Sequence, residues 1–172
     1  MDIRKYLVAA AMAVAAVPAT AAPVAATPPS HGRVLILIPL TITKIDDLDF
    51  GTIVSAPISG VVSIDATTGN RTIGGGITGV ASAAGHRAYF AGAGTPSQQV
   101  FVSVIAPPEL VSTTNSADKV QVLAMPIEGS ALKTIDPVLR TFYFGVGGVI
   151  LVGANQPDGA YEATFTVTAN YL

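Results

Sequence analysis

The stretch Gly159-Ala-Tyr161-Glu-Ala-Thr-Phe165-Thr-Val167-Thr-Ala169-Asn-Tyr171-Leu172, at the C-terminal end of the sequence, decides the fold. Its larger apolar side chains keep to odd positions: Tyr161, Phe165, Val167, Ala169 and Tyr171. Because side chains alternate between the two faces of a strand, this spacing predicts one β-strand over residues 161–172 with one apolar face. With no tail after it, such a strand is expected to leave an open edge that another segment must pair with.

Other short apolar or alternating runs lie upstream and are separated by turns rich in glycine and proline. They predict strands over residues 33–44, 60–65, 87–91, 99–106, 119–126, 139–144 and 149–152. No amphipathic helix of normal length is evident in the sequence. The pattern therefore predicts an all-β fold, an antiparallel immunoglobulin-like β-sandwich of about seven to eight strands.

The N-terminal residues 1–21 match the three parts of a secretory signal peptide. Arg4 and Lys5 precede an apolar run, residues 7–17, that is too short to span a bilayer. A buried N-terminal helix is the less favoured alternative. We therefore expect export with cleavage near Ala21.

The chain that remains after cleavage divides into two parts. Residues 22–32 are rich in proline and small residues and predict an extended arm. Residues 33–172 are long enough for one β-sandwich domain with its own core. No other apolar run reaches membrane-spanning length, so we expect no membrane span after signal cleavage.

Composition excludes several classes of function. The net charge is −2 and only 12% of residues are charged, so no basic surface is available for nucleic acid. The chain has no cysteine, which rules out disulfides, thiolate metal sites and thiol catalysis. Stability must therefore come from core burial or from partner chains.

A search for catalytic or metal-binding motifs finds none of sufficient specificity. The two histidines, His31 and His86, have no third ligand at a zinc-like spacing, and no nucleophile elbow follows a strand. The acidic cluster at 46–49 lacks the oxygen-donor spacing of a calcium loop and is better explained as a turn. We therefore predict no enzyme activity, no cofactor and no metal.

Three stretches together resemble a family of secreted proteobacterial domains of unknown function. They are residues 47–54 followed by 60–64, the middle of the chain with glycine-rich turns around valine strands, and residues 152–171. Asp47-Leu48-Asp49-Phe50-Gly51 and the C-terminal stretch are the parts that together are specific. The ending, with Gly159, Tyr161, Phe165, Val167 and Tyr171, is also similar to that of chaperone–usher fimbrial pilins of the archaic, spore-coat-U-like kind. The resemblance implies a pilin-like sandwich that could be incomplete until the N-terminal extension of a neighbouring subunit supplies a donor strand. It also implies passage through the periplasm and a final location at the cell surface or outside the cell.

The leading interpretation is a structural subunit of a bacterial surface fimbria or similar exported assembly, polymerised by β-strand addition. Val34, Ile36 and Ile38 are then the donor-strand residues, whereas Tyr161, Phe165, Val167 and Tyr171 line the acceptor groove or the adjoining core. The implied partners are neighbouring copies of the chain, a periplasmic chaperone and an outer-membrane usher.

A self-contained secreted or periplasmic β-sandwich is the alternative interpretation. The arm would then fold back onto its own domain, and the protein would act as an adhesin-like binding module. Residues 107–118, predicted as a long loop, are the candidate binding segment in that case.

Overall fold

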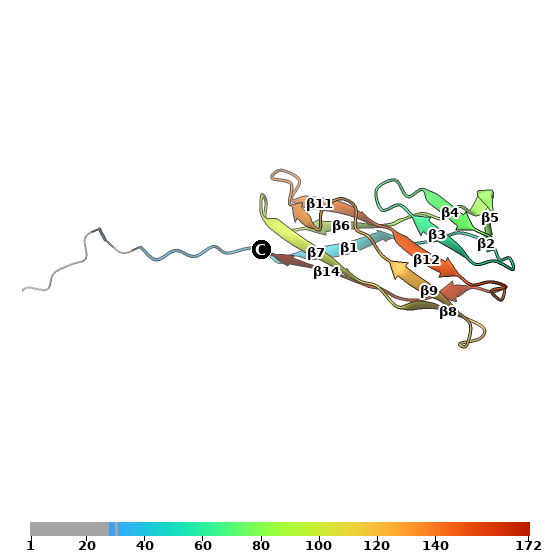
Figure 1. Cartoon of the computed structure of the whole chain (residues 1–172). Helices are drawn as coiled ribbons and strands as arrows, with labels where there is room; N and C mark the ends of the chain where they lie inside the picture. Colours follow the sequence, from blue (N-terminus) through green and yellow to red (C-terminus); the bar gives the residue numbers. More distant parts are fainter. Residues whose placement is uncertain (1–27, 30) are drawn as a thin grey trace, which may run out of the picture. The chain divides into compact units, whose positions relative to one another are not determined.

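The computed structural model describes residues 28–29 and 31–172. The predicted signal peptide, residues 1–21, and most of the predicted arm lie outside the described residues. Residues 36–172 form one compact unit, and the fold below is the fold of that unit (Figure 1).

The regular secondary structure of the described part is β-strand, apart from one short 3-10 helix over Ala81–Ala83. The strands are β1 (Thr41–Asp46), β2 (Ile53–Val54), β3 (Gly60–Ile64), β4 (Arg71–Gly75), β5 (Thr78–Gly79), β6 (Ala88–Ala93), β7 (Gln99–Ile105), β8 (Glu109–Ser112), β9 (Lys119–Ala124), β10 (Leu132–Thr134), β11 (Thr141–Val146), β12 (Gly148–Val152), β13 (Tyr161–Glu162) and β14 (Thr166–Tyr171). Several of them have only two or three residues, which explains why they outnumber the seven to eight that the sequence predicts.

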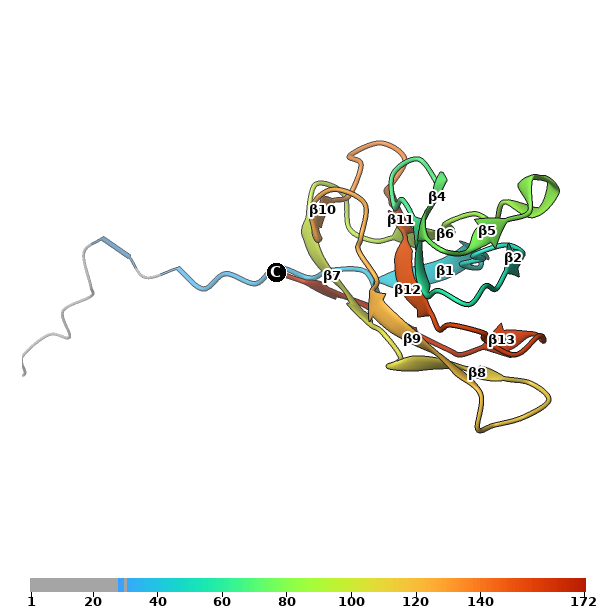
Figure 2. The same cartoon turned by 45° about the vertical axis from the view of Figure 1, so that its right-hand side comes forward.

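The strands pair in antiparallel fashion and form four sheets, with the orders β1-β6-β11, β10-β7-β14, β13-β8-β9-β12-β3-β4 and β2-β5. These sheets pack face to face (Figures 1 and 2). The fold is thus an all-β, antiparallel β-sandwich, which confirms the predicted fold class.

Two apolar cores hold the sheets together. The first lies between β1-β6-β11 and β10-β7-β14 and contains Phe90, Val100, Val102, Phe142 and Phe144, all buried. The second lies against the six-stranded sheet, and its buried residues are Val62, Ile77, Val120, Ile150 and Val152. Partly buried side chains such as Ile53 and Tyr161 pack against it. Burying each of these large side chains contributes about 1.5–3 kcal/mol.

One nearly continuous ribbon connects the two cores. β11 belongs to the first sheet and β12 to the six-stranded sheet, and only Gly147 separates them. The backbone of Gly147 lies so close to the carbonyl oxygen of Ile64 that a Cβ could not fit there. A glycine at this position therefore lets the chain pass from one sheet to the other without a long loop.

The predicted terminal strand over residues 161–172 is wrong as a single element. It consists of β13, which pairs with β8, and β14, which pairs with β7. Tyr161 packs against the second core and Phe165 against the first. The chain changes core between them, and residues 163–165 are consequently not in a strand.

Two other predicted boundaries also differ from the structure. The predicted strand over 33–44 begins only at Thr41, and Pro39, which has no amide donor, lies just before this start. The predicted loop over 107–118 contains β8, which pairs with both β9 and β13. Pro107 and Pro108 obscured this strand in the sequence because proline interrupts the alternating pattern.

Candidate functional site: a groove between two open edges

A groove runs between two segments that are far apart in the sequence. One wall consists of residues 42–55, which include most of β1 and all of β2, and the other consists of residues 156–167, which include β13 and the start of β14. Two cavities lie along it. The lining of one adjoins the lining of the other at residues 47–48 on the first wall and at residues 162–163 on the second. We call this feature the edge groove, with a proximal cavity at the β1–β14 end and a distal cavity at the β2–β13 end.

The strands that border the edge groove are open edges. β1 and β14 bond only to β6 and β7, respectively, and β2 and β13 only to β5 and β8, among the strands of residues 31–172. An edge strand presents unpaired N–H and C=O groups along its outer side, and these groups are a template for another strand. The backbone on both sides of the groove is therefore able to accept an added strand.

The proximal cavity has a volume of about 360 Å³ and reaches the first core. Its apolar side chains are Ile42, Phe90, Phe165 and Val167, and Lys44 and Asp47 form an ion pair at its rim with 2.6 Å between Nζ and Oδ1. The rings of Phe90 and Phe165 pack edge to face, with centroids 6.2 Å apart. A core aromatic, Phe90, is thus part of the wall of an open cavity.

Hydrogen bonds around Tyr171 close the outer end of the edge groove, where β1 begins and β14 ends. Its hydroxyl accepts a bond from the Thr95 amide (2.7 Å) and donates one to the Ile38 carbonyl oxygen (2.9 Å). The Ile38 amide in turn donates to Oγ1 of Thr95 (2.9 Å). These three bonds fix the point at which the chain before β1 leaves the domain.

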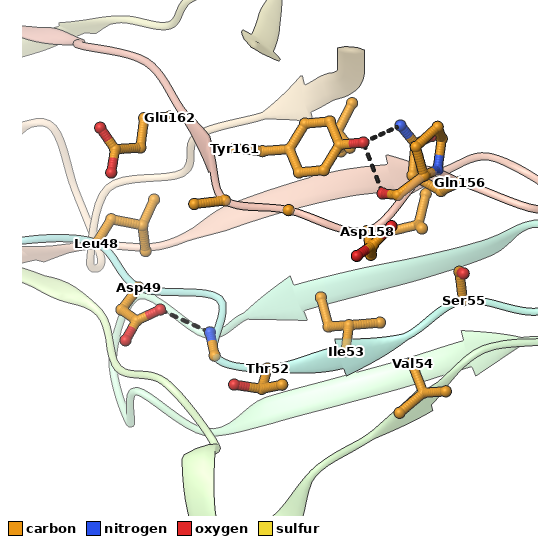
Figure 3. A pocket seen from close by; sticks show the side chains of 16 residues that line it. Leu48, Asp49, Thr52, Ile53, Val54, Ser55, Gln156, Asp158, Tyr161 and Glu162 are labelled. Atoms are coloured by element: carbon orange, nitrogen blue, oxygen red, sulfur yellow. Dashed lines mark hydrogen bonds between the residues drawn. The ribbon is translucent and has the colours of Figure 1, made fainter. Parts of the chain in front are cut away.

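The distal cavity is larger, about 810 Å³, and lies between residues 48–55 and 156–162 (Figure 3). Ile53, Val120 and Val152 give it an apolar lining from the second core. Three acidic residues, Asp49, Asp158 and Glu162, are also part of its lining, which contains no Lys, Arg or His. The cavity therefore combines an apolar lining with an excess of negative charge.

Hydrogen bonds hold both walls of the distal cavity. The hydroxyl of Tyr161 donates to the Pro157 carbonyl oxygen (2.8 Å) and accepts from Nε2 of Gln156 (2.9 Å) (Figure 3). On the opposite wall, Oδ1 of Asp49 accepts a bond from the Gly51 amide (2.7 Å), and Gly51 has a positive φ of 72° that favours glycine. The lining is consequently fixed in shape before any partner binds.

Arg71 supports the wall formed by residues 50–52 from behind. Its guanidinium donates to the carbonyl oxygens of Phe50 (3.2 Å) and Thr52 (3.1 Å). It also donates to the carbonyl oxygens of Ala83 (2.9 Å) and Val80 (2.8 Å). A single side chain thus joins two segments, residues 50–52 and 80–83, which are also linked by backbone bonds between Thr52 and Val80 and between Thr52 and Ala83.

The residues predicted for an acceptor groove lie in different parts of it. Phe165 and Val167 line the proximal cavity, Tyr171 closes its outer end, and Tyr161 belongs to the distal cavity. Sequence reasoning missed the opposite wall, including Ile42, and it also missed the core residue Phe90 of β6, which lines the proximal cavity. No local signal pairs those residues with the C-terminal stretch, because only the topology brings them together.

The residues predicted for a donor strand precede β1. Ile36 is 83% exposed and Ile38 is 47% exposed, and neither is in a strand. Val34 lies outside the compact unit and is likewise not in a strand. Ile38 differs from the other two because its amide and carbonyl group are both hydrogen-bonded to the domain.

The described residues contain no group of three or more His, Asp or Glu side chains placed to hold a metal ion. Nor does the part of the chain that the structure describes contain a helix long and apolar enough to cross a membrane.

Comparison with known proteins gives one match. No curated protein and no solved structure is detectably similar to this chain. Residues 40–171 match a family model described as a domain of unknown function (DUF4402). That region begins just before β1, ends with β14 and includes both walls of the edge groove. The chain therefore belongs to the DUF4402 family of domains of unknown function.

Proposed function

We propose that this protein is a structural subunit of an exported assembly, a surface fimbria or a similar polymer. Residues 34–38 of one copy are inserted between β1 and β14 of the next copy. The observation that carries the proposal is the pair of open edges on either side of a cavity that reaches Phe90 of the first core. β-Strand addition suits such a site because it supplies both backbone partners and apolar side chains.

The length and pattern of the donor segment support this proposal. Five extended residues span about 17 Å, and the six residues of β14 span about 20 Å. Val34, Ile36 and Ile38 share one face of an extended chain and would project together toward Phe165 and Val167. Burying three such side chains contributes about 4.5–9 kcal/mol before the cost of ordering the segment.

The hydrogen bonds of Ile38 set where the donor segment leaves its own domain. Thr95 and Tyr171 hold the main chain at this residue, whereas Ile36 makes no hydrogen bond within the described residues. Residues 34–37 are thus available to a neighbour while β1 stays paired with β6, and Ile38 joins the inserted segment when its two hydrogen bonds open.

An open groove on an isolated copy also has consequences before assembly. Exposed edges and a cavity that opens into the core promote non-specific strand pairing. We therefore assign to this protein a periplasmic chaperone that covers the groove in transit, and an outer-membrane usher that accepts the subunit for assembly at the cell surface. Both partners follow from the resemblance of the C-terminal stretch to fimbrial pilins.

The test is a denaturing gel of the exported protein, loaded with and without boiling. Strand-exchanged polymers should give a ladder of multiples in the unboiled sample that collapses to one subunit mass on boiling. Ile36→Asp should remove the ladder, because it places a charge in the apolar proximal cavity.

Leu35→Asp is the matched control, because Leu35 is adjacent and exposed but lies on the opposite face of the extended segment. This variant should keep the ladder. A single monomer band from the unmodified protein, together with a lower melting temperature for Ile36→Asp, would contradict the proposal. That result would favour the self-contained domain, in which the segment completes its own sandwich.

A further inference from the structure

The turn between β10 and β11 is a rigid apolar projection. Val138 and Leu139 are 81% and 71% exposed, although both are large aliphatic residues. Oδ1 of Asp136 accepts bonds from their amides, at 2.8 Å and 2.7 Å, and the Arg140 amide donates to the Asp136 carbonyl oxygen at 3.1 Å. A preorganised turn loses little conformational entropy on binding, and its two adjacent aliphatic side chains give it an apolar surface that a partner could bury.

The charge of this turn is complementary to that of the distal cavity. Arg140 ends the turn, and it takes part in no ion pair within residues 31–172. The same holds for the cavity's acidic residues Asp49, Asp158 and Glu162. The turn thus presents two aliphatic side chains and a cation, whereas the cavity presents an apolar lining and three carboxylates.

The turn and the distal cavity lie at opposite ends of the unit. The turn leads into β11 at Thr141, and the β11–β12 ribbon ends at Val152, just before the loop that lines the cavity. Twelve extended residues span about 40 Å. Figure 1 shows the orange turn and the dark red loop after β12 at the two ends. A copy cannot fill its own distal cavity with this turn, so the complementarity is between copies.

The turn also lies beside the point where the donor segment leaves the domain. The Gly94 amide donates to the Arg140 carbonyl oxygen (3.1 Å), and the next residue, Thr95, holds Ile38. The bonds of Tyr171 close the outer end of the edge groove, so a donor segment enters it from the β2–β13 end. A copy that passes residues 34–38 into a neighbour's edge groove therefore carries its turn toward the distal cavity of that neighbour. A contact between opposite ends is heterologous, and repeated contacts of this kind give an open chain of copies.

We propose that the turn over residues 136–140 of one copy docks in the distal cavity of the next copy. This inference rests on the proposed function, because it adds a second contact to the strand-exchanged junction. Val138 and Leu139 occupy the apolar lining formed by Ile53 and Val152. Arg140 lies against the carboxylates at the cavity rim.

The test uses the absence of native cysteine from the chain. The double variant Leu139→Cys with Ser55→Cys places one thiol on the turn and one on the lining of the distal cavity. After mild oxidation of the assembled full-length protein, a boiled, non-reducing gel should show a ladder that disappears on reduction. The control pairs Leu139→Cys with Gln121→Cys, because Gln121 is exposed on β9 next to the cavity residue Val120 but faces away from it. This pair should stay monomeric on the boiled gel.

The unboiled, reducing gel of the same samples reports strand exchange separately. A strand-exchange ladder without a disulfide ladder would overturn the docking proposal and leave the proposed function standing. A disulfide ladder without a strand-exchange ladder would support docking between copies and contradict strand insertion. An equal ladder from the control pair would also overturn the docking proposal, because the cross-link would then reflect random collision.

Discussion

The centre of this sandwich, at β6, and its edges, at β1 and β14, differ in how many strand partners they have, although all three strands border the first core. In the centre, β6 has partners on both sides, and Phe90, Phe142 and Phe144 stack with ring centroids 5.3 to 6.1 Å apart. At the edge, β1 and β14 each have one partner among the described strands, and the cavity between them reaches the same Phe90. The centre therefore provides the stability of the fold, and the edge provides a surface that another chain can complete.

The largest expected effect comes from breaking the centre. Phe144 is fully buried and stacks on two other rings, so Phe144→Ala should lower the free energy of unfolding by about 3–5 kcal/mol. Tyr143→Ala changes the next residue of β11, which is 50% exposed, and should cost about 1–2 kcal/mol. Urea denaturation measures both values. Equal losses would show that the centre does not dominate stability.

A smaller effect is expected at Arg71, which supports the groove wall from β4, an edge strand of the six-stranded sheet. Arg71→Met removes the side-chain donor from four carbonyl oxygens, of which Phe50 alone has no backbone donor among the described residues, and should cost about 1.5–3 kcal/mol. Hydrogen exchange of the amides at residues 50–54 should accelerate more than exchange in β6. Arg140→Met is the control, since the Arg140 side chain makes no hydrogen bond within the described residues and its loss should leave this exchange unchanged.

The free energy of unfolding should change less for a substitution at Tyr171, which closes the outer end of the groove. Tyr171→Phe removes the hydroxyl that joins Thr95 to Ile38 and should cost about 1–2 kcal/mol. Amide exchange should accelerate at Thr95 and Ile38. The corresponding change in the distal cavity, Tyr161→Phe, also removes a hydroxyl with two partners and should instead affect the loop over 156–160. The same exchange pattern in both variants would contradict the separation of the two ends.

The smallest expected effect is the pH response of the β10–β11 turn. Backbone hydrogen bonds from Leu139 and then Val138 hold the pKa of Asp136 below its usual value. A carboxyl whose pKa is lower in the folded state stabilises the fold above its unfolded pKa, and this stability is lost as the pH falls below about 4. Exchange at the Val138 and Leu139 amides should therefore rise on acidification. Asp136→Asn should remove this pH dependence, and a variant that keeps it would contradict the assignment.

The sequence predicted those parts of the fold that depend on local alternation. The half-buried residues Val167, Ala169 and Tyr171 occupy alternate positions of β14, as their spacing indicates. Tyr161 has the same parity but packs against the second core, because the chain changes sheets at residues 163–165. Whether a residue has an odd or an even number does not indicate which sheet its strand joins.

The candidate site depended on features that no local pattern contains. One wall of the edge groove comes from residues 42–55 and the other from 156–167, so the groove exists only after the chain has folded. β2 and β13 have two residues each and are too short for a periodic signal. The side chain of Arg71 could not be assigned either, because its four acceptors are backbone oxygens, which every residue has.

The pairing of β1 with β6 has a mechanical consequence for a polymer of this chain. The donor segment leads into β1 through Pro39 and Leu40, so tension along the polymer would pull β1 along its own axis. The hydrogen bonds of an antiparallel pair lie perpendicular to the strands, so such a load shears the β1–β6 ladder and is shared by its bonds. A junction loaded in shear resists rupture better than one whose bonds are peeled apart in turn, and this geometry suits a subunit that carries force.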